Sequence, residues 1–311
     1  MANPSVASSS VATTAQEAHR DALASYTPKR KWTLGRILGR ILFWALIAFL
    51  FLYTLFPYVW AFLTSIRPNT ENGQIPVSYW PKTFTWEQYR YTFSDDSGFL
   101  LALRNSAIVS VSVVLISIAF GASAAYALGR LKFRGRSFVL YMILSMTTFP
   151  AIAILGTLFQ VIRQARIYDS YWALIFSYLI FTLPFTVWTL TNFFKAMPGE
   201  LEESALVDGA TPFRAFWQIL LPLALPGLVT TGLLAFINAW NEYLFALTFT
   251  NSEDARTAPV VIANFAGNTQ FDVPWGAIMA ASVTVTLPLI VLVLVFQRLI
   301  IGGLTAGAVK G

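Results

Sequence analysis

Long apolar runs separated by short polar segments dominate this sequence. Six of the runs are long enough to cross about 30 Å of hydrocarbon as a helix; they cover 41–64, 106–127, 138–162, 171–194, 223–248 and 277–301. The pattern therefore predicts an all-α membrane protein with about six transmembrane helices in residues 41–301. Each of the last four runs contains a proline, which removes a ladder hydrogen bond and is expected to kink its helix: Pro150, Pro184, Pro226 and Pro288.

The two ends of the chain do not follow this apolar pattern. Residues 1–27 are rich in Ser, Ala and Thr and lack apolar periodicity, which indicates a disordered cytoplasmic tail. Residues 28–40 mix Trp32 and Leu34 with Lys and Arg, so we expect a short amphipathic helix lying on the membrane surface. Residues 302–311 are expected to form a cytoplasmic C-terminal tail.

The distribution of charge predicts the orientation. The chain has 21 Lys and Arg against 15 Asp and Glu, an excess that in a soluble protein would suggest nucleic acid. Here most basic residues flank alternate ends of the predicted spans, as in cytoplasmic loops that face anionic lipid. We therefore expect no nucleic-acid partner and a multi-pass protein of the bacterial inner or plasma membrane with both termini in the cytoplasm. The clearest contributions come from Lys29, Arg30, Lys31, Arg36, Arg40, Arg130, Lys132, Arg134 and Arg136.

The loop 195–222 departs from this charge rule, because it should be cytoplasmic and yet is rich in acids. Its sequence predicts a helix that opens after Pro198, carries acids in its first turn and stops at Gly209. A second helix should start with Thr211 as its N-cap and Pro212 at its first position. Such a helical corner could be a knob that a soluble partner grips or a surface linker between two spans, and the local pattern leaves both open.

The same loop carries a family motif. The residues Glu203-Ser204-Ala205, then Gly209, then Ile219-Leu220-Leu221-Pro222 resemble the EAA loop of binding-protein-dependent ABC importer permeases, E-A-A-x3-G-x9-I-x-L-P. Every spacing fits, and Ser204 in place of the central alanine is the one departure. The segments 208–212, 238–242 and 302–311 further resemble the maltose and trehalose permease branch.

This resemblance implies a fold and a set of partners. The fold would be that of type I ABC importer permeases, with a cytoplasmic coupling helix. The chain would pair with a second, different permease, two ATPase subunits and an extracytoplasmic sugar-binding protein, and would import a di- or oligosaccharide by alternating access. ATP and Mg would be bound by the ATPase subunits, so we expect no cofactor on this chain. The ATPase-coupling residues would be Glu203, Ser204, Ala205, Leu206, Asp208, Gly209, Ile219 and Pro222.

The ends and outer loops also have expected roles. In the family the C-terminal tail contacts the ATPases, which gives 304–311 that candidate role. The loop 258–271 would reach the binding protein through Asn264, Gly267 and Asn268. The first outer loop is dense in aromatic residues, typical of either an interfacial belt in contact with membrane lipid or a surface that receives a protein; these are Tyr79, Trp80, Trp86, Tyr89, Tyr91 and Phe93.

The inventory of reactive groups narrows the function. No Gly-x4-Gly-Lys-Ser/Thr phosphate loop occurs, so ATP hydrolysis would need separate chains and this chain is not expected to be an enzyme. The sequence has no cysteine and one histidine, His19 in the N-terminal tail. That excludes the histidine base or metal ligands of a membrane-embedded hydrolase, and we expect no metal site.

An ion-coupled secondary transporter or channel is the alternative, because it needs an ionisable group inside the membrane. Glu242 is the one clear candidate in the spans, with Asn238 on the same predicted helix face and Asn241 beside it. These three side chains either line a polar sugar path or pack against the partner permease. The inner path lacks a cluster of basic residues, which argues against an anionic cargo.

Overall fold

The computed structural model describes residues 34–265 and 273–306, and in these ranges the secondary structure is helical with no β-strand. Four helices are each long and apolar enough to cross a membrane: α2 (Leu34–Ser65), α5 (Phe99–Arg130), α8 (Tyr171–Ala196) and α15 (Trp275–Ala306). Two bent pairs raise the number to six if each pair is one span. The expectation of an all-α membrane protein is confirmed, and the described residues hold four to six such helices where about six were expected.

The third and fifth predicted runs are the bent pairs. Helices α6 (Arg136–Met146) and α7 (Ala151–Gln164) meet at 94°. The segment Pro212–Leu223 meets α12 (Leu225–Trp240) at 74°. Pro150 directly precedes α7 and Pro226 lies in the first turn of α12, where a missing N–H is tolerated. By contrast, Pro184 and Pro288 lie inside uninterrupted helices.

The fifth span also ends earlier than the sequence predicts. Helix α12 stops at Trp240, and the short helix α13 (Leu244–Phe249) begins after a non-helical step. The prediction of one helix over 223–248 is therefore wrong at this point. The reason is local: the Glu242 carboxylate accepts the backbone N–H groups of Phe245 at 2.9 Å and Ala246 at 3.1 Å, and so caps a new helix.

The first helix forms a unit that is described by itself. The structure divides at Pro57, inside α2, into one unit that ends there and a second that begins at Tyr58. Helix α2 runs without interruption from Leu34, so residues 34–40 form one continuous helix with the first predicted span. The expected tail 1–27 and residues 28–33 lie outside the described residues. At the other end, α15 continues to Ala306, which makes 302–306 helical, while 307–311 are not described.

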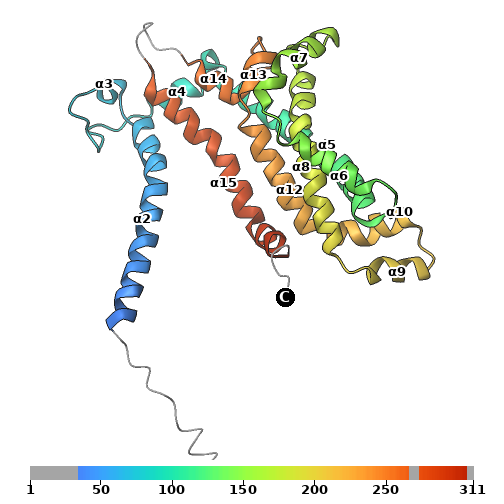
Figure 1. The fold of residues 1–311 in the computed structure, drawn as a ribbon. Helices are drawn as coiled ribbons and strands as arrows, with labels where there is room; N and C mark the ends of the chain where they lie inside the picture. Colours follow the sequence, from blue (N-terminus) through green and yellow to red (C-terminus); the bar gives the residue numbers. More distant parts are fainter. Residues whose placement is uncertain (1–33, 266–272, 307–311) are drawn as a thin grey trace, which may run out of the picture. The chain divides into compact units, whose positions relative to one another are not determined.

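The core of the second unit lies between α5, α8 and α12, which run side by side in Figure 1. Two apolar clusters fill it. The first includes Val109, Val113, Leu174, Phe245 and Phe249. The second, toward the other end of α5 and α8, includes Ala125, Tyr126, Leu190, Phe194, Phe216 and Leu220. Figure 1 places α9 (Glu200–Val207) and α10 (Pro212–Ala215) at one end of these helices, and α13 and α14 (Ala258–Ala263) at the other.

The helices α5 and α8 approach closely at Gly121. A Cβ atom on Gly121 would lie 2.5 Å from the Cγ2 atom of Thr186, whose side chain is fully buried. We expect Gly121→Ala to destabilise the fold by about 1–3 kcal/mol through overpacking. Adding Thr186→Ala should restore most of the loss, because it removes the clashing methyl group. Thermal unfolding in detergent measures both effects.

Gly156 in α7 supplies the control, since a Cβ atom there would meet nothing within 4 Å. Gly156→Ala should leave the unfolding temperature unchanged or raise it slightly, because alanine is the better helix former. If Gly121→Ala and Gly156→Ala behave alike, close packing of α5 on α8 at this level is refuted.

Candidate functional site

The 195–222 segment folds as the helical corner that its sequence predicts. Helix α9 ends in a paired C-terminal cap, in which the Gly209 N–H donates to the Leu206 carbonyl at 3.1 Å and the Ala210 N–H to the Ala205 carbonyl at 2.9 Å. Gly209 has φ = +84°, a left-handed conformation that glycine adopts at the lowest cost. The Thr211 hydroxyl then caps α10 by accepting the Arg214 N–H at 3.3 Å. Both predicted caps are confirmed.

Most of the expected coupling residues lie on the surface of this corner. Glu203, Ser204, Leu206, Asp208, Gly209 and Pro222 are exposed, and Ile219 is partly exposed within a π-helical turn, η2 (Phe216–Leu220). Ala205 departs from the expectation, because its side chain is only 4% exposed. It holds α9 against the rest of the unit and cannot itself face a partner. The short helix α11 (Leu221–Leu223) follows.

Apolar side chains on the same corner complete the surface. Val207 is 87% exposed, Phe213 71% and Trp217 51%, and the ring centroids of Phe213 and Trp217 lie 6.1 Å apart in an edge-to-face contact. The motif did not point to these three residues. Their signal in the sequence is apolar character inside a loop that is otherwise polar and acidic.

A cluster around Arg130 fixes α9 to the end of α5. The Arg130 Nε donates to the Glu202 carboxylate at 3.0 Å, and its two terminal nitrogens donate to the carbonyls of Met197 at 3.0 Å and Pro198 at 3.1 Å. The Tyr126 hydroxyl donates to the other Glu202 oxygen at 2.7 Å. We call Arg130, Glu202 and Tyr126 the Arg130 cluster. These charge-assisted contacts hold the start of α9 against the end of α5.

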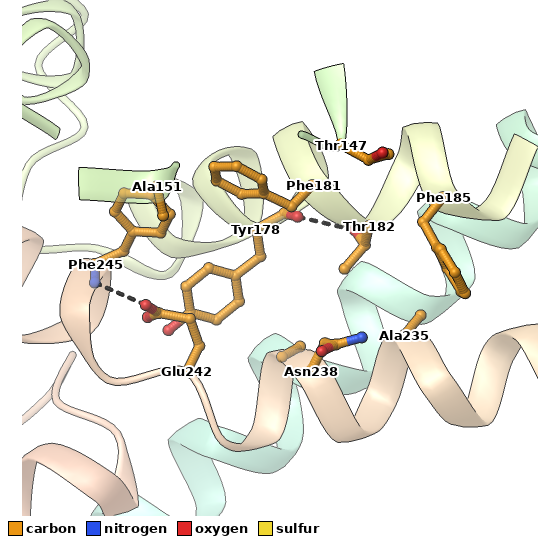
Figure 2. Close-up of a pocket in the computed structure, with 11 residues that line it drawn as sticks. Thr147, Ala151, Tyr178, Phe181, Thr182, Phe185, Ala235, Asn238, Glu242 and Phe245 are labelled. Atoms are coloured by element: carbon orange, nitrogen blue, oxygen red, sulfur yellow. Dashed lines mark hydrogen bonds between the residues drawn. The ribbon is translucent and has the colours of Figure 1, made fainter. Parts of the chain in front are cut away.

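A second feature is a cavity of about 320 Å³ between α8 and α12, shown in Figure 2. Asn238 and Glu242 both line it, so two of the three expected pathway residues are brought together. They meet because the chain turns after α12, and not through helix periodicity. Asn241 does not line the cavity; its side-chain amide donates to the Ile237 carbonyl at 2.8 Å.

The remaining wall of the cavity is mainly aromatic and hydroxylated. Its described lining includes no Lys or Arg, and Glu242 is its one acid. Tyr178 comes from the first half of α8, where nothing in the apolar pattern distinguishes it from a core residue. The aromatic and hydroxylated lining also includes Phe181, Thr182, Phe185 and Phe245.

The end of the unit opposite the 195–222 segment is held by buried polar contacts. The Asn105 side chain is fully buried and donates to the carbonyls of Glu253, Asp254 and Arg256 at 3.0–3.2 Å. The Tyr171 hydroxyl donates to the Asn105 side-chain oxygen at 2.6 Å. Here α14 ends at the exposed Asn264. Gly267 and Asn268, the other two candidates for contact with a binding protein, lie outside the described residues.

The first outer loop contains α3 (Asn69–Asn72), α4 (Glu87–Thr92) and the turn η1 (Asp95–Ser97). Its aromatic side chains are mostly exposed, including Tyr79, Trp80 and Trp86. The loop is closed by Glu71, whose carboxylate accepts the Thr83 hydroxyl at 2.6 Å, the Lys82 N–H at 3.1 Å and the Thr83 N–H at 3.2 Å.

These contacts predict a pH dependence. The hydrogen bonds from the Thr83 hydroxyl and the Lys82 N–H hold the pKa of the Glu71 carboxyl below its ordinary value. The ionised Glu71 carboxyl then stabilises the folded state fully above its pKa in the unfolded chain, about 4.3. This stabilisation is lost as the pH falls through the lower pKa of the folded protein. Glu71→Gln should therefore lower the unfolding temperature at pH 7 and make no difference once wild-type Glu71 is protonated. Glu87→Gln, at an exposed acid of the same loop, is the control substitution in the same measurement.

Comparison with known proteins identifies the family. A model of the family described as "Binding-protein-dependent transport system inner membrane component" matches residues 99–305. The chain belongs to this family. Members of the family are transport components of the membrane rather than enzymes. The expectation of a multi-pass membrane protein is therefore confirmed. In the residues that the structure describes, no group of three or more potential metal-binding side chains occurs.

Individual relatives cover almost the whole chain. "Trehalose transport system permease protein SugB" of Mycobacterium tuberculosis is 42% identical over 88% of this chain and 98% of its own length. "Trehalose/maltose transport system permease protein MalG" of Thermococcus litoralis is 41% identical over 83% and 92%. "Sulfoquinovosyl glycerol transport system permease protein SmoH" of Agrobacterium fabrum is 37% identical over 83% and 89%.

A solved structure agrees with the fold. The chain superposes on a chain of the "bacterial ABC transporter involved in the import of the acidic polysaccharide alginate" with a TM-score of 0.75, at 23% identity and over 86% of this chain and 98% of that one. The resemblance of the chain to permeases of this family, and the helical permease fold that it implies, are both confirmed.

Proposed function

We propose that this chain is one permease subunit of an ATP-driven sugar importer and forms half of a heterodimeric pathway for a di- or oligosaccharide. The observation that carries the proposal is the identity of 42% and 41%, over nearly the full length, with permeases named for trehalose and for trehalose and maltose. The cavity supports a neutral cargo, because its described lining has aromatic rings, hydroxyls and an amide but no basic side chain.

The energy would come from two separate ATPase subunits, since this chain has no phosphate loop for holding ATP and Mg. The exposed side chains of Leu206, Val207, Phe213 and Trp217 suit a groove on a soluble partner. In this proposal the 195–222 segment and both termini face the cytoplasm. Closure of the ATPase pair would move α9, and the Arg130 cluster would pass this movement to α5. The cavity would then open alternately to the two sides of the membrane.

The opposite end would face an extracytoplasmic sugar-binding protein. Asn264 is exposed at that end, where Asn105 also binds the backbone of residues 253–256. The aromatic first outer loop would either meet membrane lipid or form part of the same contact. A second, different permease would complete the pathway on the other side of the cavity.

Uptake by proteoliposomes tests the proposal. The chain is purified with its co-expressed partners, and labelled trehalose or maltose is supplied outside with the binding protein. We expect uptake with ATP and Mg inside and none with a proton or sodium gradient alone. Uptake driven by an ion gradient without ATP would support the ion-coupled alternative, for which Glu242 is the ionisable group in the cavity, and would overturn the importer proposal.

A further inference from the structure

We propose that the cavity between α8 and α12 is a sugar-ring subsite in this subunit, in which Tyr178, Asn238 and Glu242 bind hydroxyl groups of the cargo. The proposal rests on the proposed function and deepens it, because it assigns direct contact with the sugar to this chain. The break between α12 and α13 is the first support. Non-helical backbone at membrane depth is tolerated where it lines a cavity, and interrupted helices mark binding sites in transporters.

The polar groups of the cavity retain unused hydrogen-bonding capacity. Tyr178 is 2% exposed, and its hydroxyl faces the Glu242 carboxylate (Figure 2) without a partner at hydrogen-bonding geometry among the described residues. Each Glu242 oxygen accepts one backbone N–H and keeps a second lone pair. The Asn238 amide donates to the Leu234 carbonyl, which leaves its oxygen as an acceptor. A buried hydroxyl without a partner is costly, and a ligand would supply the missing partner.

The size and walls of the cavity fit one pyranose ring. Its volume of about 320 Å³ lies at the lower end of small-molecule sites, which span about 300–1,000 Å³. Phe181 and Phe245 stack at 5.6 Å in its wall. Aromatic faces carry partial negative charge and suit the C–H groups on the flat side of a sugar ring. The acceptors Glu242 and Asn238 and the hydroxyl of Tyr178 then match the edge of the ring, where its hydroxyls lie.

Tyr178→Phe tests the subsite, because it removes only the unpartnered hydroxyl. In proteoliposomes containing the full complex with ATP inside, we expect trehalose uptake to fall about five- to tenfold, the effect of losing one hydrogen bond. The unfolding temperature should change little, since the hydroxyl has no partner at hydrogen-bonding geometry among the described residues. Tyr141→Phe is the matched control, because Tyr141 is 69% exposed on α6 and does not line the cavity; its uptake should equal the wild type.

A comparison of sugars separates binding from a structural effect. Singly deoxygenated trehaloses should be taken up more slowly than trehalose by the wild type, and for the analogue lacking the hydroxyl that meets Tyr178 the Tyr178→Phe variant should show no such difference. If wild type and Tyr178→Phe take up every sugar at equal rates, the subsite is overturned while the importer stands. If the wild type shows no ATP-dependent sugar uptake at all, the proposed function fails and the subsite fails with it.

Discussion

Gly209→Val is expected to abolish ATP-dependent uptake while the chain still inserts into the membrane. Gly209 has φ = +84°, and a Cβ atom there would meet nothing within 4 Å, so the whole cost is in the backbone. A β-branched residue in this conformation costs roughly 1–3 kcal/mol. The corner between α9 and α10 would refold to avoid that cost, and the exposed face around Leu206 would lose its shape. Uptake and membrane content are measured in the same vesicles.

Two further variants serve as controls for this prediction. Gly209→Asn should retain much of the uptake, because asparagine tolerates the left-handed conformation. Gly135 has φ = +87° with open space around it, in the turn between α5 and α6, so Gly135→Val imposes the same backbone cost away from the 195–222 segment. Equal uptake by Gly209→Val and Gly135→Val would refute a special role for the corner.

Arg130→Ala is expected to uncouple ATP hydrolysis from uptake. The side chains of Arg130 and Glu202 are only 10% and 17% exposed, and the substitution also leaves the carbonyls of Met197 and Pro198 without a donor. Breaking a fully buried pair costs about 3–5 kcal/mol, and for this partly exposed pair we expect about 2 kcal/mol. With α9 no longer fixed to α5, sugar moved per ATP hydrolysed should fall at least about tenfold, since 1.4 kcal/mol is one factor of ten.

Arg134→Ala is the matched control, because Arg134 is an exposed arginine in the turn that follows α5. Arg134→Ala should leave the amount of sugar moved per ATP hydrolysed at the wild-type value. Arg130→Lys should be intermediate, since an ammonium group cannot serve three acceptors in the geometry of a guanidinium. A wild-type ratio for Arg130→Ala would show that the Arg130 cluster does not transmit movement.

Much of the fold follows from local features of the sequence. The apolar runs predict α5, α8 and α15 to within several residues, because a helix that spans lipid must satisfy its own backbone within one continuous apolar stretch. The corner at Gly209 and the cap at Thr211 were equally predictable, since each depends on one or two residues and the backbone beside them. The family motif lies in that same local segment.

Long-range contacts determined what the sequence could not. Ala205 belongs to the motif, yet packing of α9 buries it. Glu202 lies outside the quoted motif, yet it meets Arg130 and Tyr126 across more than 70 residues of chain. Nothing local distinguishes these residues, because their roles arise from partners on another helix. The sequence therefore located the 195–222 segment, and the tertiary structure showed which of its side chains face outward.

The cavity shows most clearly which features the sequence predicts and which depend on tertiary packing. Sequence alone marked Asn238 and Glu242 as polar residues inside an apolar run, which is a strong signal in a membrane protein. Their assignment to one helix face was wrong, because α12 ends before Glu242 and the carboxylate caps α13. Tyr178 came from α8 without any signal, since a tyrosine in an apolar span has the pattern of a core residue. The order of residues in the sequence determined that polar groups lie within the spans. Only the packing of α8 against α12 decided which of these groups meet, because that packing joins residues far apart in the chain.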